Sequence, residues 1–160
     1  MNSLLQNIDS FGDDSILIAA TNHQNLLDPA IWRRFNKVIE VPMPSNGELK
    51  AYAQRFIRPY MSTKIKPKLY AALEGLSFSD LNTATKNAFY NATLEGSENG
   101  FTAYHLARET YVLKHHSLED QDAFLRYLIN AGCTLREINK KSGISMRRIQ
   151  AASHAIKEGA

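Results

Sequence analysis

The apolar residues of the first 44 positions form two short continuous runs. ILIAA (16–20) and VIEV (38–41) are bounded by turn residues and prolines, a pattern typical of strands that are buried on both faces of a parallel sheet. An apolar helical face precedes them at 4–8 and stops at the turn cluster 10–15. Since two strands cannot make a stable parallel sheet alone, we expect this part to be the end of a larger α/β domain.

From residue 45 onward the apolar residues recur at helical spacing. Residue pairs that cap helix starts occur along this part: Ser45 with Glu48, Ser77 with Asp80, Ser117 with Asp120, and Thr134 with Glu137. Further helices are expected to begin near 66, 102 and 145. The sequence therefore predicts an α/β remnant followed by mainly α structure, in three domains: 1–44, 45–116 and 117–160.

Composition excludes several classes of protein. Of the 160 residues, 44% are hydrophobic and 22% are charged, which is ordinary for a folded domain and unlike a disordered tail or a collagen. No apolar run approaches the roughly 18 residues of a membrane span, and the N-terminus lacks the features of a signal peptide. The single cysteine, Cys133, cannot form an internal disulfide, which favours a cytoplasmic location. No spacing of His, Cys and carboxylates predicts a metal site.

Five sequence elements occur in order in the run 4–44: a helix at 4–11, ATN at 20–22, LDPA at 27–30, an Arg-Phe turn at 34–35, and a strand ending in P-x-P at 38–44. In this order and spacing they resemble the AAA family of ATPases, in the stretch that follows the Walker B strand. The resemblance implies the C-terminal part of a parallel-sheet P-loop ATPase domain. It also implies ATP and Mg²⁺ as cofactors of the parent chain, and a ring of identical subunits, expected to be a hexamer.

Candidate catalytic residues lie in this run. Asn22 follows the apolar run 16–20, at the strand end where open parallel sheets bind ligands. An amide can orient an attacking water without adding charge, and the resemblance implies that Asn22 is the family's sensor-1 asparagine. The resemblance also implies that Arg34 is the arginine finger, which reaches the nucleotide of the next subunit. Arg33 lies beside it, and Lys37 occupies the position of a second family arginine, where it supplies charge without a bidentate fork.

The stretch 74–89 resembles the lid signature of the same family. Gly75, Ser77 and Asp80 match that signature, and the resemblance implies that they lie near the bound nucleotide. A helix start offers free N–H groups to phosphates. Ser77 and Asp80 would also serve a simple capped helix, and the two interpretations are compatible.

Two motifs of an ATPase are absent from the sequence. No G-x-x-x-x-G-K-[ST] stretch and no apolar strand ending in D-E occur, so the residues that cradle phosphate and hold Mg²⁺ are missing. We therefore expect the 160 residues alone to be inactive. The parent chain is expected to couple ATP hydrolysis to the remodelling of a protein or nucleic-acid client.

The stretch 134–156 resembles a helix-turn-helix. Residues 133–157 hold six bases and one acid, which favours a nucleic-acid partner. Asn139 and Ser142 depart from the small and apolar residues usual at their positions. The candidate DNA contacts are Lys140, Lys141, Ser145, Arg147, Arg148 and Gln150. A protein-docking trihelical unit stays open, and the alternative function is a non-enzymatic DNA-binding or adaptor module.

Overall fold

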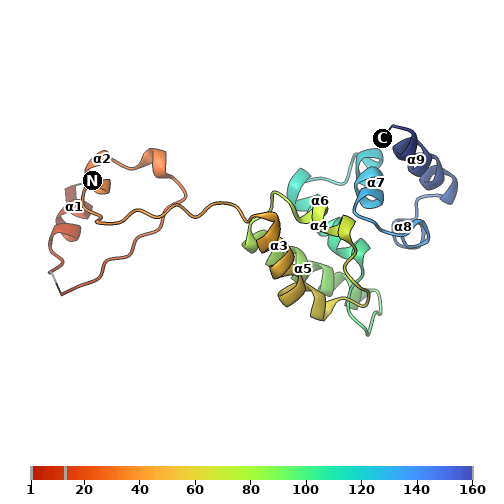
Figure 1. The fold of residues 1–160 in the computed structure, drawn as a ribbon, viewed down its shortest axis with the longest axis horizontal. Coiled ribbons are helices and arrows are strands. Elements are labelled where there is room, and N and C mark those ends of the chain that lie inside the picture. Colours follow the sequence, from red (N-terminus) through yellow and green to blue (C-terminus); the bar gives the residue numbers. More distant parts are fainter. Residues whose placement is uncertain (1, 13, 160) are drawn as a thin grey trace. The chain divides into compact units, whose positions relative to one another are not determined.

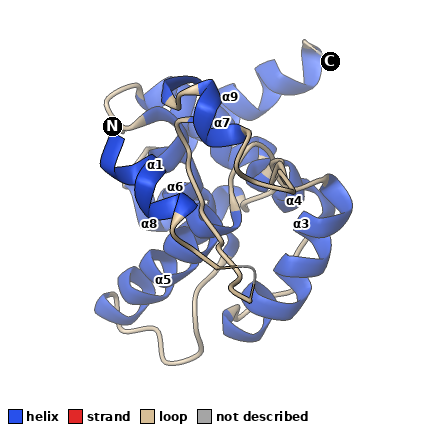
Figure 2. Ribbon diagram, turned by 90° about the vertical axis from the view of Figure 1, so that its left-hand side faces the viewer, coloured by secondary structure: helices blue, strands red, loops and turns tan. Residues whose placement is uncertain are grey.

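The computed structural model describes residues 2–12 and 14–159. The chain divides into two compact units, Met1–Pro42 and Met43–Ala160, which Figure 1 colours from red to orange and from orange to blue. The described residues form helices and loops, and no strand is found among them (Figure 2). None of the helices in this part combines the length and apolar character that a membrane span requires.

The first unit holds two short α-helices. Helix α1 (Asn2–Asp9) ends where the sequence predicts, before the turn cluster, and α2 (Pro29–Trp32) follows a 3-10 turn at Gln24–Leu26. Asp28 begins α2 because its Oδ1 accepts the N–H of Ala30 at 2.8 Å, which satisfies one of the free donors of a helix start. Proline at the first helical position adds a backbone angle already suited to the helix.

The two predicted strands are not formed. Residues 16–20 and 38–41 carry no regular structure, and Ile16, Ile18 and Val41 are 90%, 86% and 88% exposed. A strand needs a neighbour whose N–H and C=O groups pair with its own, and the described part of the chain supplies none. The apolar pattern of a buried strand therefore faces solvent.

The second unit begins with the predicted helix over 45–59. Helix α3 (Asn46–Tyr52) starts at Ser45 with the expected capping box, in which the Ser45 N–H donates to Glu48 Oε2 at 2.8 Å. The helix continues through a π-helical turn at Ala53–Ile57 and a 3-10 turn at Arg58–Tyr60. Its buried side, which includes Leu49, faces the core of the unit.

Three helices make the centre of this unit: α4 (Pro67–Leu73), α5 (Phe78–Leu94) and α6 (Ala103–His115). The α5–α6 contact is the most extensive between helices, because α5 presents small, fully buried residues that allow a close approach: Ala84, Ala88 and Ala92. The loop between them returns to the end of the first helical segment, where the Phe101 N–H donates to the Tyr60 carbonyl at 3.0 Å.

The last three helices are α7 (Gln121–Asn130), α8 (Leu135–Ser142) and α9 (Met146–Glu158). They lie at the cyan-to-blue end of the second unit in Figure 1. Helix α7 packs on α4, α6 and α9, and α8 packs on α9 and α6. Leu125, Ile138 and Ile149 are fully buried in the core that the earlier helices share. The predicted mainly helical structure is confirmed for this unit, and its last helices are part of one common core.

Candidate functional site

Arg34 is held by an acidic residue of α1. Its Nε donates to Asp9 Oδ1 at 2.6 Å, its Nη2 to Asp9 Oδ2 at 2.8 Å, and its Nη1 to the Ala30 carbonyl at 2.9 Å. The hydrogen bond from Arg34 holds the pKa of Asp9 below its ordinary value, and the same bond raises the pKa of Arg34. The side chains are 31% and 52% exposed. The guanidinium is therefore fixed in direction, and a phosphate would compete with the Asp9 carboxylate for its N–H groups.

The other candidate catalytic residues of the first unit stand apart from this pair. Asn22, Arg33 and Lys37 are all exposed. Within the part of the chain that the structure describes, no hydrogen bond or ion pair connects Asn22 with Arg33, Arg34 or Lys37. The amide and the cations are thus not assembled into one site by this unit alone.

The start of α5 is a complete capping box. The Ser77 N–H donates to Asp80 Oδ2 at 3.0 Å, and the Asp80 N–H donates to Ser77 Oγ at 3.1 Å. The Ser77 hydroxyl also donates to the Asp80 carboxylate at 2.7 Å. Gly75, with a φ of +75°, makes the turn that leads into this start, in a region that favours glycine. The polar atoms of Ser77 and Asp80 are thus used in the cap, and a ligand here would meet backbone N–H groups and the neighbouring Phe78.

An aromatic cluster beside this helix start was not found from the sequence. The ring of Phe78 stacks on Tyr52 with centroids 5.1 Å apart, and Tyr52 lies 4.9 Å from Phe56. Phe56 and Phe78 are 49% and 42% exposed. The spacing of Tyr52 and Phe56 is the helical i, i+4 spacing, but it predicts a core face, and only the fold brings Phe78 to it.

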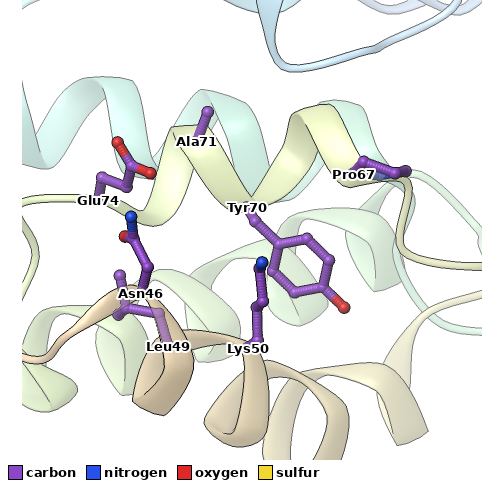
Figure 3. A pocket seen from close by; sticks show the side chains of 7 residues that line it. All are labelled: Asn46, Leu49, Lys50, Pro67, Tyr70, Ala71 and Glu74. Carbon is purple, nitrogen blue, oxygen red and sulfur yellow. The ribbon is translucent and has the colours of Figure 1, made fainter.

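The surface of the second unit has at least two hollows. One of about 180 Å³ lies between α3 and α4, and Figure 3 shows its lining side chains: Asn46, Leu49, Lys50, Pro67, Tyr70, Ala71 and Glu74. The other, of about 340 Å³, is lined by Asn91, Leu94, Glu95, Tyr104, His105, Arg108, Glu109 and Lys141. Ligand pockets measure about 300–1,000 Å³, so the first is too small for a nucleotide. Neither lining includes Gly75, Ser77 or Asp80.

The larger hollow contains a buried histidine. His105 is 2% exposed, and its Nδ1 accepts the Thr102 N–H at 3.1 Å, so the proton is assigned to Nε2, which faces Glu95 Oε2 at 3.2 Å. Lys141 Nζ donates to the same Glu95 oxygen. Burial lowers the pKa of His105. This polar cluster joins the end of α5, the start of α6 and α8, and its members are too far apart in sequence for a motif to reveal it.

Two of the six candidate DNA contacts are engaged within the unit. Lys141 pairs with Glu95, and Arg148 bonds to Asp122 Oδ1 at 2.7 Å and to Gln121 Oε1 at 3.0 Å. The other four are exposed, and no side-chain hydrogen bond or ion pair to them is found in residues 2–12 and 14–159: Lys140, Ser145, Arg147 and Gln150. Two of the candidate DNA contacts are thus held by other side chains of the unit, and the other four are exposed to a partner.

The described residues form neither a reactive thiol nor a metal site. Cys133 is buried, and burial raises the pKa of its thiol to about 12, so it is not a nucleophile at neutral pH. Among the described residues no group of His, Cys, Asp and Glu side chains is placed to hold a metal ion. The Mg²⁺ that the AAA resemblance implies would need ligands from outside these residues.

Residues 1–43 match the family model described as ATPase family associated with various cellular activities (AAA). This match, together with the curated relatives below, confirms the resemblance to the AAA ATPases.

Curated relatives carry the likeness further along the chain. A proteasome-activating nucleotidase of Aeropyrum pernix is 39% identical over 103 residues, which is 61% of this chain and 25% of that protein. An uncharacterized AAA family ATPase, y4kL, of Sinorhizobium fredii is 33% identical over 95 residues, or 59% of this chain and 29% of that protein. A proteasome-activating nucleotidase of Saccharolobus islandicus is 34% identical over 99 residues, 58% and 25% of the two chains. The chain thus spans about a quarter of the length of these relatives. No solved structure was found to match it.

Proposed function

We propose that this chain is the C-terminal part of an AAA ATPase domain, and that the whole protein couples ATP hydrolysis to the remodelling of a protein or nucleic-acid client. The observation that carries the proposal is the match of residues 1–43 to the AAA family model. Within this stretch Asp9 and the Ala30 carbonyl hold the guanidinium of Arg34. A guanidinium stays protonated and spreads its charge over phosphate oxygens. Arg34 is the proposed arginine finger.

The proposed role of Asn22 is to orient the attacking water. Its amide offers one acceptor and two donors, it is exposed, and phosphoryl transfer depends on positioning more than on covalent chemistry by the protein. Arg33 and Lys37 add positive charge close to Arg34 in the sequence. Arg33 would attract the same phosphate oxygens as Arg34. Lys37 would act on these oxygens as a point charge.

The proposed lid is 45–116. Its contact with nucleotide would be the start of α5, where Gly75, Ser77 and Asp80 shape a capped helix end. Free N–H groups at such an end favour phosphate. Neither of the two hollows described above includes these residues, so the proposal places the rest of the nucleotide site on residues outside this unit.

The protein is proposed to work as a ring of identical subunits, with six as the expected number. The first unit leaves Asn22 and Arg34 without a mutual contact among its described residues, which fits roles at two different nucleotides. Asn22 would act on the nucleotide of its own subunit and Arg34 on that of the next. The exposed runs 16–20 and 38–41 are proposed to pair with strands of the preceding part of the ATPase domain.

The test uses a longer chain of the same protein that includes a P-loop and a D-E strand. Arg34→Ala is expected to lower the rate of ATP hydrolysis about a thousandfold or more, as arginine fingers do, while the Kd for ATP stays within about twofold. Asn22→Ala is likewise expected to lower the rate of ATP hydrolysis.

Arg126→Ala is the matched control, because Arg126 is an exposed arginine of α7. Unchanged hydrolysis in Arg34→Ala would remove its role as the finger. ATP turnover by the 160 residues alone would contradict the proposal that they are an incomplete catalytic unit.

A further inference from the structure

Helices α8 and α9 form a tightly joined pair. Ile138 of α8 and Ile149 of α9 are fully buried, and Ile144 and Ala152 pack against the same core. Gly143, with a φ of +71°, ends α8, and α9 begins at Met146. Because α7 also packs on α9, the three helices make one trihelical unit (Figure 1).

Side-chain hydrogen bonds fix the turn between the two helices. Asn139 Nδ2 donates to the Ile144 carbonyl at 2.7 Å. Ser142 Oγ donates to the Ile138 carbonyl at 2.7 Å and accepts the Ile144 N–H at 3.2 Å. Asn139 and Ser142 are the two departures from the usual helix-turn-helix pattern, and here both stabilise the turn. A fixed turn holds α9 in one orientation, which lowers the ordering cost of binding.

The surface of this pair is basic and almost free of acids. Residues 138–157 contain no Asp or Glu until Glu158 follows. The preceding acid, Glu137, has its Oε1 buried. Lys140 and Arg147 are exposed, and within the described part of the chain no ion pair engages them. A surface with cations and few anions attracts a polyanion.

Because two cations of this surface are held in ion pairs, a smaller set of polar side chains can contact a ligand. Lys141 is held by Glu95, and Arg148 by Asp122, so these two orient α8 and α9 within the unit. Lys140 and Arg147 remain available, and Gln150 lies three residues after Arg147 on the same side of α9. Lysine and arginine suit phosphates, and glutamine can bond both Hoogsteen-edge groups of adenine in the major groove.

The same surface lacks the apolar anchors of a protein interface. The large hydrophobic side chains that the structure exposes all lie between Phe11 and Leu94, and none is found in the described residues from 95 onward. Protein interfaces depend on a few buried aromatic and aliphatic anchors. A basic surface without such anchors fits the backbone of a nucleic acid better than a protein groove.

We propose that α8 and α9 are a duplex-DNA interface, in which Lys140 and Arg147 contact phosphates and Gln150 reads base edges. This interface does not depend on the proposed ATPase role, and a protein can have both. Binding is therefore expected in the 160-residue chain without nucleotide.

The experiment titrates a labelled DNA duplex with the 160-residue chain and follows fluorescence anisotropy at about 50 and 200 mM salt. The test variant is Lys140→Ala/Arg147→Ala. The control, Lys64→Ala/Lys86→Ala, removes the same charge from exposed positions outside α7, α8 and α9. The test variant is expected to bind about tenfold more weakly or worse, and to flatten the slope of log K against log salt by about two. The control is expected to stay within about twofold.

Further variants separate the roles. Gln150→Ala is expected to change the preference among duplex sequences and to leave the salt slope unchanged. If the alanine pair lowers the melting temperature, Lys140→Gln/Arg147→Gln replaces it, because glutamine removes the charge but keeps part of the aliphatic stem of the side chain.

Three results would overturn the proposal. The first is no binding at the lower salt concentration, and the second is equal weakening in the test and control variants. The third is equal affinity for labelled polyglutamate with the same loss in Lys140→Ala/Arg147→Ala, which would assign the surface to acidic protein partners. Each is independent of ATP hydrolysis by the longer chain.

Discussion

Asp9 and Arg34 form a two-point ion pair, with Nε–Oδ1 and Nη2–Oδ2 distances of 2.6 and 2.8 Å. The pair links the end of α1 to the residue two positions after α2. The Ala30 carbonyl adds a third point of contact for the guanidinium. A phosphate that meets Arg34 would therefore compete with the Asp9 carboxylate for the guanidinium N–H groups.

The pKa of Asp9 is expected to lie below its ordinary value, because Arg34 donates to the charged carboxylate. A carboxylate whose pKa is lowered by folding stabilises the folded state above its unfolded pKa of about 3.9. That contribution is lost as pH falls through the folded pKa. NMR titration of the carboxyl carbon checks this: Arg34→Ala should return the pKa of Asp9 to the ordinary range, and Lys37→Ala should not. A pKa that stays low in Arg34→Ala would show that another group causes the shift.

Stability is expected to fall in mild acid because of His105. Burial lowers its pKa below the ordinary 6.5, and Lys141 adds to the effect, while Glu95 and Glu137 oppose it. The unfolded chain then binds a proton more readily than the folded one. This contribution to the free energy of unfolding is complete above pH 6.5 or so and declines below it, toward the folded pKa.

Urea unfolding between pH 5 and 8 or so checks the role of His105. His105→Gln should flatten the pH dependence of the free energy of unfolding, because glutamine does not titrate. Its side chain can still accept the Thr102 N–H as a capping-box residue. His154→Gln is the control, since His154 is exposed and its Nδ1 lies beside Glu158 of the same helix. An unchanged pH dependence in His105→Gln would mean that other groups cause it.

Tyr127→Phe is expected to lower the free energy of unfolding by about 1–2 kcal/mol. The Tyr127 hydroxyl donates to the Ala72 carbonyl at 2.9 Å and lies 3.0 Å from Thr110 Oγ1, so it ties α7 to α4 and α6. Tyr90→Phe, at a residue that is 64% exposed, should change stability by less than about 0.5 kcal/mol. Equal effects would contradict the docking of α7 through this hydroxyl.

Gly100→Ala is expected to cost about 2 kcal/mol or more in unfolding free energy. Gly100 has a φ of +88°, and an added Cβ would lie 2.2 Å from the Tyr60 carbonyl oxygen. The backbone there must approach closely because Phe101 bonds to Tyr60. Gly47→Ala is the matched control: it lies in α3 with open space around it, and alanine favours a helix by up to about 1 kcal/mol. A neutral Gly100→Ala would show that the loop can move away.

The positions of most helices could be predicted because the signals are local. A cap residue and its partner three positions later satisfy the free N–H groups of a helix start, and Ser45, Ser77 and Thr134 begin α3, α5 and α8 as expected. At the start before α7, the cap is Asp120, while Ser117 Oγ accepts the Glu119 N–H in the turn ahead of it.

The predicted strands and the partners of charged residues could not be obtained in the same way. The runs 16–20 and 38–41 have the composition of buried strands, but a strand exists only when another backbone pairs with it. Likewise, no local rule indicates that Asp9 binds Arg34, or that Glu95 binds Lys141. These pairs depend on where separate elements meet.

The sequence by itself determined the helical segments of the second unit and the likeness of residues 4–44 to the AAA ATPases, because caps, spacing and motifs are properties of neighbouring residues. Only the tertiary structure decided which charges are anchored and which stay exposed, since Lys141 and Arg148 look like Lys140 and Arg147 until the fold brings Glu95 and Asp122 to them. It also decided that α7, α8 and α9 share one core with the preceding helices, because burial depends on contacts between residues far apart in the chain.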